Sequence, residues 1–358
     1  MKKTVLTVVL LLTVGFGARW IMSQQERVKF AESDVKGRWE HKQLGTYVLI
    51  DGSLYKDHGG GKFSFLEKYY DPEFQEKNYS KEGDAIYRCS PEDPTTRIRI
   101  RNEFKDDFES YKTVHDLMIT EENIADKAVV VDGVKNYDPD QLSTRWSSLI
   151  LQSPKYPTVK DYVALRKRIL KGDQGFEENR VEPSTERAHS GSRSVRFFSV
   201  AKSRSMVCSK ASMATDMMHF VKGEDFWFAG WFYFEKGMPT TIMDLESTWL
   251  NKHSGIRILF SENGNPSIEL KAFDKPMWRN REYSIPRNQW VHVKAHFLLD
   301  EKDGKLELWI DDQQVIDETG QTLPLADSVY DSLEVGISAC VKETILFADD
   351  VQVSKQDF

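Results

Sequence analysis

The chain has 358 residues, of which 40% are hydrophobic and 29% charged, and its formal net charge is −7. That length and apolar fraction suit two domains, or one large β domain with an extension. The acidic balance, without a cluster of Lys and Arg, excludes nucleic acid as a partner because phosphate binding needs concentrated positive charge.

Residues 1–23 have the pattern of an export segment. A basic start is followed by an apolar run at 4–18 that ends in small residues, which is typical of a cleaved secretory signal. The run is shorter than the ~20 residues of a spanning helix, but Trp20, Ile21 and Met22 could extend it into an uncleaved anchor. We therefore expect a secreted, periplasmic or envelope-anchored protein that meets a membrane only through this segment.

Residues 24–140 form a β-rich segment of unknown type. Residues 47–50 predict a strand before an Asp-Gly turn, and residues 97–101 alternate as in a half-exposed strand. One helix is expected at 156–172, with Thr158 and Asp161 in capping-box positions.

From about residue 180 the pattern changes to short apolar runs separated by turn residues. The expected strands are 194–198, 225–234, 240–247, 255–260, 267–273, 290–299, 305–311, 332–339 and 344–353. Many short strands with such separators favour a two-sheet antiparallel sandwich. We predict an all-β jelly roll over residues 145–358, with one short helix and the β-rich extension before it.

Alternation within these strands puts apolar and polar side chains on opposite faces. Val291, Val293, Ala295 and Phe297 share one face of their strand, and the other face is polar. The same design recurs in the neighbouring runs, and aromatic residues join it. We predict that the polar sides together floor one groove lined by Asp244, Glu246, Arg257, Glu269, Lys271, His292, Lys294 and His296, with Trp227, Trp231 and Tyr233 as ring platforms for sugars. The alternative is a solvated outer sheet with ion pairs between its strands.

The three cysteines leave two interpretations open. Cys208 and Cys340 fall in the same expected domain and are the preferred pair if an exported protein forms a disulfide, which leaves Cys89 unpaired. Alternatively, all three are reduced and buried thiols.

Four stretches carry a resemblance to a known fold: residues 187–197, 288–297, 304–315 and 346–354. They combine a turn of small residues, a strand begun by Trp290, a hairpin ending in Asp311 and a closing strand with Asp349 and Asp350. In this pattern residues 145–358 resemble the concanavalin A-like lectin/glucanase superfamily, including laminin-G-type and heparin-lyase-like jelly rolls. The resemblance implies a concave sheet beneath a groove for a polysaccharide, which suits the polar faces described above.

Hydrolysis of a glycan is one candidate chemistry. Asp244 and Glu246 are two apart on a strand, so their Cα atoms lie ~6.6 Å apart, within the range that glycosidases use. Hydrolases of the resembling superfamily have a third acid two residues earlier, where this chain has Ile242. That departure counts against hydrolysis by this motif.

Elimination from a uronate is the second candidate. It needs a base, a cation to neutralise the carboxylate and an acid for the leaving oxygen. His292 or His296 could be the base, Arg257, Lys271 or Lys294 the cation, and Tyr233 or Tyr283 the acid. Two further possibilities remain open: glycan binding without catalysis, through Asp244, Glu246, Glu269, Lys294, Trp227 and Trp231, or a purely structural role at the cell envelope.

No cofactor and no catalytic metal are expected. His292 and His296 lie ~13 Å apart on a strand, too far to share one ion. Asp349 and Asp350 could contribute oxygen ligands to a structural Ca²⁺ ion, because calcium takes carboxylate and carbonyl oxygens.

Overall fold

The computed structural model describes residues 27–358, except 32, 34, 42–44, 70–72, 90–92, 94, 121–123, 125, 174–177, 251–252 and 272–275. The expected export segment, residues 1–23, lies outside the described residues. Within the described part of the chain, no helix is both long and apolar enough to cross a membrane. The chain divides into two compact units, Met1–Pro72 and Glu73–Phe358.

This division differs from the boundary at 140–145 that the sequence pattern indicates. The reason is that much of the segment between residues 73 and 140 packs with the jelly roll. Strand β9 (Phe104–Asp106) pairs with the last strand, β25 (Thr344–Ser354). Phe108 and Leu117, which are fully buried, join the same hydrophobic core as the jelly roll.

The first unit is built on a five-stranded antiparallel sheet in the order β1-β5-β4-β3-β2. Val48, Ile50 and Phe63 form its small buried cluster. The strands are β1 (Arg27–Lys29), β2 (Val35–His41), β3 (Gly45–Ile50), β4 (Ser53–Asp57) and β5 (Lys62–Lys68).

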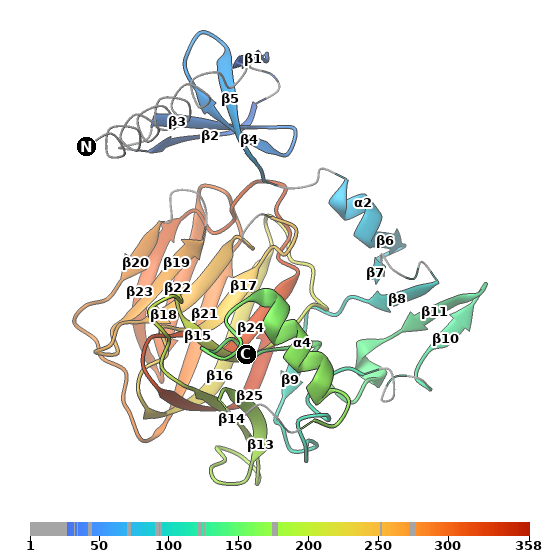
Figure 1. Cartoon of the computed structure of the whole chain (residues 1–358), viewed down its shortest axis with the longest axis vertical. Helices are drawn as coiled ribbons and strands as arrows, with labels where there is room; N and C mark the ends of the chain where they lie inside the picture. Colours follow the sequence, from blue (N-terminus) through green and yellow to red (C-terminus); the bar gives the residue numbers. More distant parts are fainter. Residues whose placement is uncertain are drawn as a thin grey trace, which may run out of the picture. The chain divides into compact units, whose positions relative to one another are not determined.

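The second unit starts with a short helix and a second five-stranded sheet, in the order β10-β11-β8-β7-β6 (Figure 1). Asp132 and Gly133 have positive φ at the β10–β11 hairpin turn, as an Asp-Gly turn requires. The elements are α2 (Phe74–Asn78), β6 (Tyr79–Glu82), β7 (Ala85–Cys89), β8 (Thr96–Arg99), β10 (Val129–Val131), β11 (Val134–Tyr137) and the 3₁₀ helix η2 (Pro139–Gln141).

Two larger sheets form the predicted sandwich. The seven-stranded sheet has the order β12-β15-β24-β17-β18-β19-β20, and the eight-stranded sheet has the order β13-β14-β25-β16-β21-β22-β23. The first comprises β12 (Ser148–Ile150), β15 (Ser209–Thr215), β17 (Thr241–Glu246), β18 (Gly255–Phe260), β19 (Pro266–Lys271), β20 (Met277–Arg279) and β24 (Ser332–Cys340). Besides β25, the second comprises β13 (Arg180–Ser184), β14 (Ser194–Ser199), β16 (Asp225–Lys236), β21 (Trp290–Leu298), β22 (Gly304–Ile310) and β23 (Gln313–Gly320).

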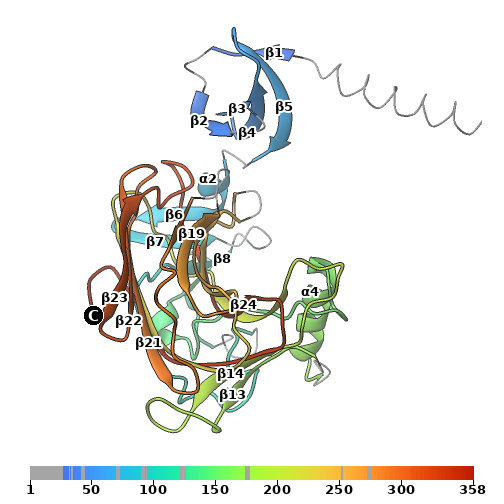
Figure 2. The same cartoon turned by 90° about the vertical axis from the view of Figure 1, so that its left-hand side faces the viewer.

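The two sheets bury their apolar faces against each other. In Figure 2, strands β21–β23 run along one side of the sandwich and β19 and β24 along the other. Val291, Val293, Ala295 and Phe297 are fully buried, as the alternation predicts, and they join residues of the opposite sheet such as Ile256 in one core. The all-β jelly-roll prediction is thus confirmed.

Helix α4 (Val159–Ile169) begins at the predicted cap. The side chain of Thr158 accepts the N–H of Asp161, and the Asp161 carboxylate accepts the N–H of Thr158, which completes the capping box. Leu165 and Ile169 are buried in the shared core. The helix packs against β12, at one edge of the seven-stranded sheet.

The three cysteines are free thiols. The preferred Cys208–Cys340 disulfide is therefore not formed. Cys340 is buried and its sulfur lies 3.3 Å from the hydroxyl of Ser199, while Cys208 is partly exposed.

Gly255 on β18 lies between two oppositely charged residues on the neighbouring strands. Glu246, Gly255 and Lys271 are register partners across β17, β18 and β19. Because Gly255 has no side chain, Lys271 can reach Glu246 over the intervening strand and form an ion pair with it. A Cβ atom at position 255 would lie 2.0 Å from the carbonyl oxygen of Leu245.

We expect Gly255→Ala to lower the free energy of unfolding by about 1–3 kcal/mol, the usual cost of forcing atoms into a packed site. The clash is with backbone, so β17 and β18 must shift. Chemical denaturation of the full chain measures the change. A Gln314→Ala variant, exposed on β23, is the control and should unfold like the unmodified protein. Equal stability of the two variants would contradict the close approach at Gly255.

Candidate functional site

The outer face of the seven-stranded sheet, the side away from the core, carries a row of acids on its floor. Strand register places Glu334, Asp244, Arg257 and Glu269 side by side across β24, β17, β18 and β19. Glu246 lies two residues after Asp244 on β17 and therefore shares its face. The acids are almost completely covered, with exposures of 2% for Asp244, 8% for Glu246, 6% for Glu269 and 2% for Glu334.

Three cations lie against these acids and reach further toward solvent. Lys271 contacts Glu246 and lies 3.4 Å from Asp244, Lys210 on β15 lies 3.5 Å from Glu334, and Arg257 donates to Glu269 from Nε at 3.0 Å. Their side chains are 19–24% exposed. We call this set the charged face: Lys210, Asp244, Glu246, Arg257, Glu269, Lys271 and Glu334. Its acids are the floor and its cations the surface.

The neighbouring carboxyls Asp244 and Glu246 have pKa values pushed in opposite directions. Burial raises the pKa of Asp244 to about 6, against the lowering effect of Lys271. Burial would also raise the pKa of Glu246, but the nearby imidazole of His253 and the charges of Lys271 and Lys210 outweigh this effect and lower the pKa to about 2. The pair therefore includes one readily protonated and one persistently ionised carboxyl, the separation that acid–base sites use.

Several residues of this site escape sequence reasoning. Lys210 and Glu334 come from strands far apart in the chain, and Ser212 donates to Glu334 at 2.5 Å. His253 lies in the loop between β17 and β18, and its Nδ1 lies 3.6 Å from Glu246. The nearby carboxylate of Glu246 raises the pKa of His253, whose side chain is 58% exposed. His253 belongs to no strand, so no alternation pattern could have indicated its place.

The carboxylates of Asp244, Glu246 and Glu334 come within 4.8 Å of one another, close enough to share a metal ion. Two ammonium groups already supply positive charge there, since Lys271 contacts the first two acids and Lys210 the third. Burial alone would lower the pKa values of both lysines, but the surrounding acids raise them instead. Lysines held in their charged form are the natural counterions of this cluster.

The other predicted site residues lie on the outer face of the eight-stranded sheet, on β16 and β21. Trp227 stacks on His296 with ring centroids 4.1 Å apart, and Trp231 packs on His292 at 5.0 Å. Lys294 lies over Trp227 at 5.2 Å. We call this set the ring face: Trp227, Trp231, Tyr233, Trp290, His292, Lys294, His296 and Trp309.

The prediction of one groove is therefore wrong. Asp244, Glu246, Arg257, Glu269 and Lys271 lie on the charged face, whereas Trp227, Trp231, Tyr233, His292, Lys294 and His296 lie on the ring face of the opposite sheet. Alternation shows which residues of one strand share a side, but not which sheet the strand joins. The chain changes sheets between β20 and β21, so the predicted bases and the predicted carboxylate-binding cations are separated by the core.

Polar groups of the ring face contact neighbouring side chains of the protein. His296 contacts Glu307 through Nδ1 and Asp225 through Nε2, both at 2.7 Å. Burial lowers the pKa of His292. Tyr233 lies under the guanidinium of Arg187, 4.3 Å from its ring centroid.

Asp349 and Asp350, where the sequence suggests a structural Ca²⁺ ion, already have hydrogen-bond partners. Asp349 accepts the backbone N–H groups of His189, Ser190 and Asp350. Burial raises the pKa of Asp349 to about 6. These donors make Asp349 an anchor of the loop at 189–190.

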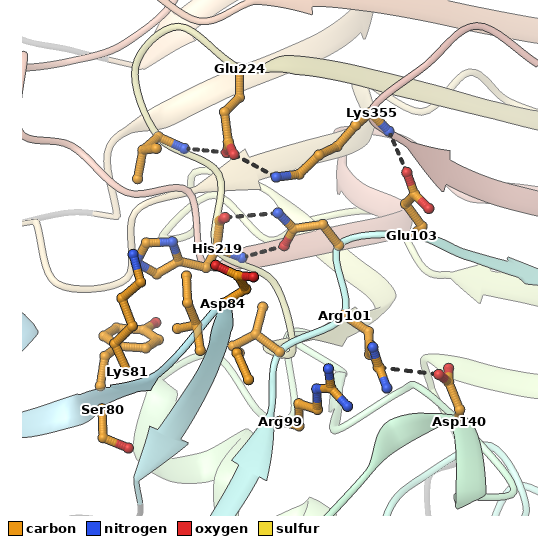
Figure 3. A pocket seen from close by; sticks show the side chains of 16 residues that line it. Ser80, Lys81, Asp84, Arg99, Arg101, Glu103, Asp140, His219, Glu224 and Lys355 are labelled. Atoms are coloured by element: carbon orange, nitrogen blue, oxygen red, sulfur yellow. Dashed lines mark hydrogen bonds and ion pairs between the residues drawn. The ribbon is translucent and has the colours of Figure 1, made fainter.

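A hollow of about 730 Å³ lies away from both of these faces, between the small sheet of β6–β8 and the loop before β16 (Figure 3). Its charged side chains pair mostly with one another: Lys355 with Glu224, and Arg101 with Asp138 and Asp140. Asn102 holds the wall in place by exchanging two hydrogen bonds with the backbone of His219. The pocket is large enough for a ligand but offers balanced charge.

By sequence, no family model matches the chain and no curated protein matches it. By structure, it is similar to an endo-β-1,4-glucuronan lyase from the fungus Trichoderma reesei, with 11% identity, a TM-score of 0.42 and coverage of 50% of this chain and 88% of that one. It is also similar to a cellulose-induced protein (13% identity, TM-score 0.42, coverage 71% and 98%) and to an alginate lyase from Aplysia kurodai (12%, 0.36, 58% and 98%). All three TM-scores are below 0.5.

The raised pKa of Asp244 predicts a specific pH dependence. Its pKa is 3.8 ordinarily and about 6 in the fold, so the folded protein binds this proton more tightly than the unfolded chain. The stability that this group contributes is complete below about pH 4 and is lost as the pH rises through about 6. Relative to the unmodified protein, Asp244→Asn should therefore gain about 3 kcal/mol of unfolding free energy between about pH 4 and about pH 7.

Urea denaturation across this pH range measures the effect, and Asp312→Asn on an exposed turn serves as the control. The difference between D312N and the unmodified protein should stay constant with pH. A constant difference for D244N as well would contradict the raised pKa.

Proposed function

We propose that this chain binds an anionic polysaccharide of the uronate class on the charged face of the seven-stranded sheet. The observation that carries the proposal is the layering of charge on that face. The carboxylates are buried beneath Lys210, Arg257 and Lys271, so a chain arriving from solvent meets ammonium and guanidinium groups first.

The three cations keep donors for a ligand. An ammonium group has three N–H donors and a guanidinium has five. In the described part of the chain, Lys210 contacts one carboxylate, Lys271 two, and Arg257 donates to Glu269 through Nε and Nη2. The remaining donors suit carboxylates repeated along a polymer, because charge-assisted hydrogen bonds are stronger than neutral ones.

Buried acids also support binding in a second way. They hold each cation in a fixed place, so a ligand does not have to immobilise a long and flexible side chain when it binds. The cost of ordering such side chains is about 0.5–1.5 kcal/mol each, and preorganisation removes it.

Binding can be tested by neutralising one ion pair as a unit. Removing Arg257 alone would leave Glu269 buried without a partner, at a cost of about 3–5 kcal/mol. The double variant R257Q/E269Q keeps a hydrogen-bonding pair without charge. We expect it to weaken binding of a uronate homopolymer about tenfold, equivalent to ~1.4 kcal/mol, in calorimetric titration.

The matched control is R187Q/E235Q, which neutralises a similar pair, 2.8 Å apart, between the β13–β14 loop and β16 of the opposite sheet. Its affinity should equal that of the unmodified protein. Failure of the unmodified protein to bind any uronate polymer would end the proposal, and so would equal losses in the two variants.

Eliminative cleavage is a second candidate function, and the position of His253 favours it. This exposed imidazole lies beside Glu246, which Lys271 also contacts. With a uronate carboxylate neutralised by Lys271, His253 would remove the C5 proton. The C4–O bond would break as the C4–C5 double bond forms, and the imidazolium would return the proton to the leaving oxygen.

The test is the ultraviolet absorbance of the unsaturated uronate formed from a uronate homopolymer. His253→Ala should reduce the rate by at least about 100-fold, the usual minimum for a general base, while polymer binding persists. His292→Ala should keep the rate, since His292 lies on the ring face. Because the base must be neutral and its pKa is raised, the rate should increase with pH to above the ordinary 6.5. Loss of activity in H292A but not in H253A would overturn this assignment.

A further inference from the structure

A pocket of about 370 Å³ lies beside the charged face, next to the β18–β19 hairpin and β20. Its lining combines guanidinium, amide, hydroxyl and apolar groups, and the members used below are Leu259, Ser261, Asn265, Ser267, Met277, Arg279 and Arg281. The volume is within the range of ligand pockets.

Strand register puts this pocket on the same side of the sheet as the charged face. Leu259 is two residues along β18 from Arg257, and Ser267 is two residues along β19 from Glu269. Leu259 pairs with Ser267, which pairs in turn with Arg279 on β20. Residues two apart share a face, so the pocket begins ~7 Å from the Arg257–Glu269 pair.

The two arginines of the pocket differ from Arg257 in charge balance. Arg257 is neutralised by Glu269, whereas neither Arg279 nor Arg281 forms an ion pair with any residue that the structure describes. Arg279 donates from Nε to the thioether of Met277 at 2.6 Å, and a thioether is only a weak acceptor. Both side chains are exposed. The pocket therefore offers two guanidinium groups that form no ion pair with a described residue.

The wall that carries Arg281 is fixed by hydrogen bonds. Asn265 donates through Nδ2 to the carbonyl oxygens of Arg281 at 3.2 Å and Tyr283 at 2.7 Å. Ser261 donates to Oδ1 of the same asparagine at 2.9 Å. The segment 281–283 is thus tied to the β18–β19 turn, which sets the backbone from which one guanidinium extends.

The remaining lining suits a sugar ring. Leu259 and Met277 supply apolar contacts for C–H groups, and Ser267 supplies a hydroxyl beside them. A guanidinium can bind a carboxylate through two parallel N–H donors, which fixes orientation as well as charge.

We infer that this pocket is the subsite that recognises the carboxylate of one uronate residue, through Arg279 and Arg281, while the charged face holds the adjoining polymer. This inference rests on the proposed function. It adds that a carboxylate of the polymer is recognised in this pocket beside the charged face, and not only on the charged face itself.

The experiment compares two polymers, a uronate homopolymer and the same polymer with its carboxyls reduced to alcohols, by calorimetric titration of the full chain. The double variant R279Q/R281Q should lose about tenfold in affinity for the uronate polymer and nothing for the reduced polymer. A charge-matched control, K112Q/K302Q, removes two exposed cations outside both sites and should behave like the unmodified protein.

The outcomes separate the two proposals. If the unmodified protein prefers the uronate polymer and R279Q/R281Q keeps that preference in full, the subsite is refuted while the proposed function stands. If the variant loses affinity for both polymers equally, the arginines do not recognise the carboxylate, and the subsite is likewise refuted. Absence of binding by the unmodified protein overturns both. R281E, which reverses one charge, provides a second variant and should weaken uronate binding further than R281Q.

Discussion

The outer face of the seven-stranded sheet depends on one constraint: each buried carboxylate needs a cation within reach. Moving an unpaired carboxylate out of water costs several kcal/mol, and only a well-placed partner offsets that cost. Register provides the partners here, since Asp244 lies beside Arg257 and Glu246 faces Lys271 across Gly255. A shift of β18 by one residue would turn these side chains toward the core and its aliphatic ones toward solvent. The ion pairs thus specify the pairing of β17, β18 and β19 as strongly as the apolar core does.

The same constraint explains why the site presents cations. Lysine and arginine have long aliphatic stems, so they can cover the acids while their charged ends reach water. Aspartate and glutamate are shorter and remain below. A sheet face on which four acids outnumber three cations can therefore still show positive groups to solvent, and the formal net charge of −7 for the whole chain does not describe this surface.

The sequence predicts features that depend on a few neighbouring residues, but not features that depend on pairing between distant strands. The cap at Thr158, the strand at 255–260 and the buried side of β21 follow from patterns within a few residues, and the structure confirms them. The assignment of strands to sheets depends on pairings between distant segments, such as β17 with β24, which no local pattern records. For this reason Asp244, Arg257 and Lys271 were grouped correctly with one another but wrongly with His292 and His296. The pairing of Glu334 with Asp244 across β24 and β17 is equally invisible to a local pattern.

The contrast between the two outer faces decides where a ligand is expected. On the ring face, His296 is held by two carboxylates and Lys294 lies over two indole rings and 3.0 Å from Asp357, so these polar groups complete one another. On the other side, cations with remaining donors adjoin a pocket whose two guanidinium groups form no ion pair within the part of the chain that the structure describes. A surface whose hydrogen bonds are already made gains little from a new partner, whereas donors left to water can exchange it for carboxylates. The seven-stranded sheet is therefore the face on which the proposed acidic polymer would gain most from binding.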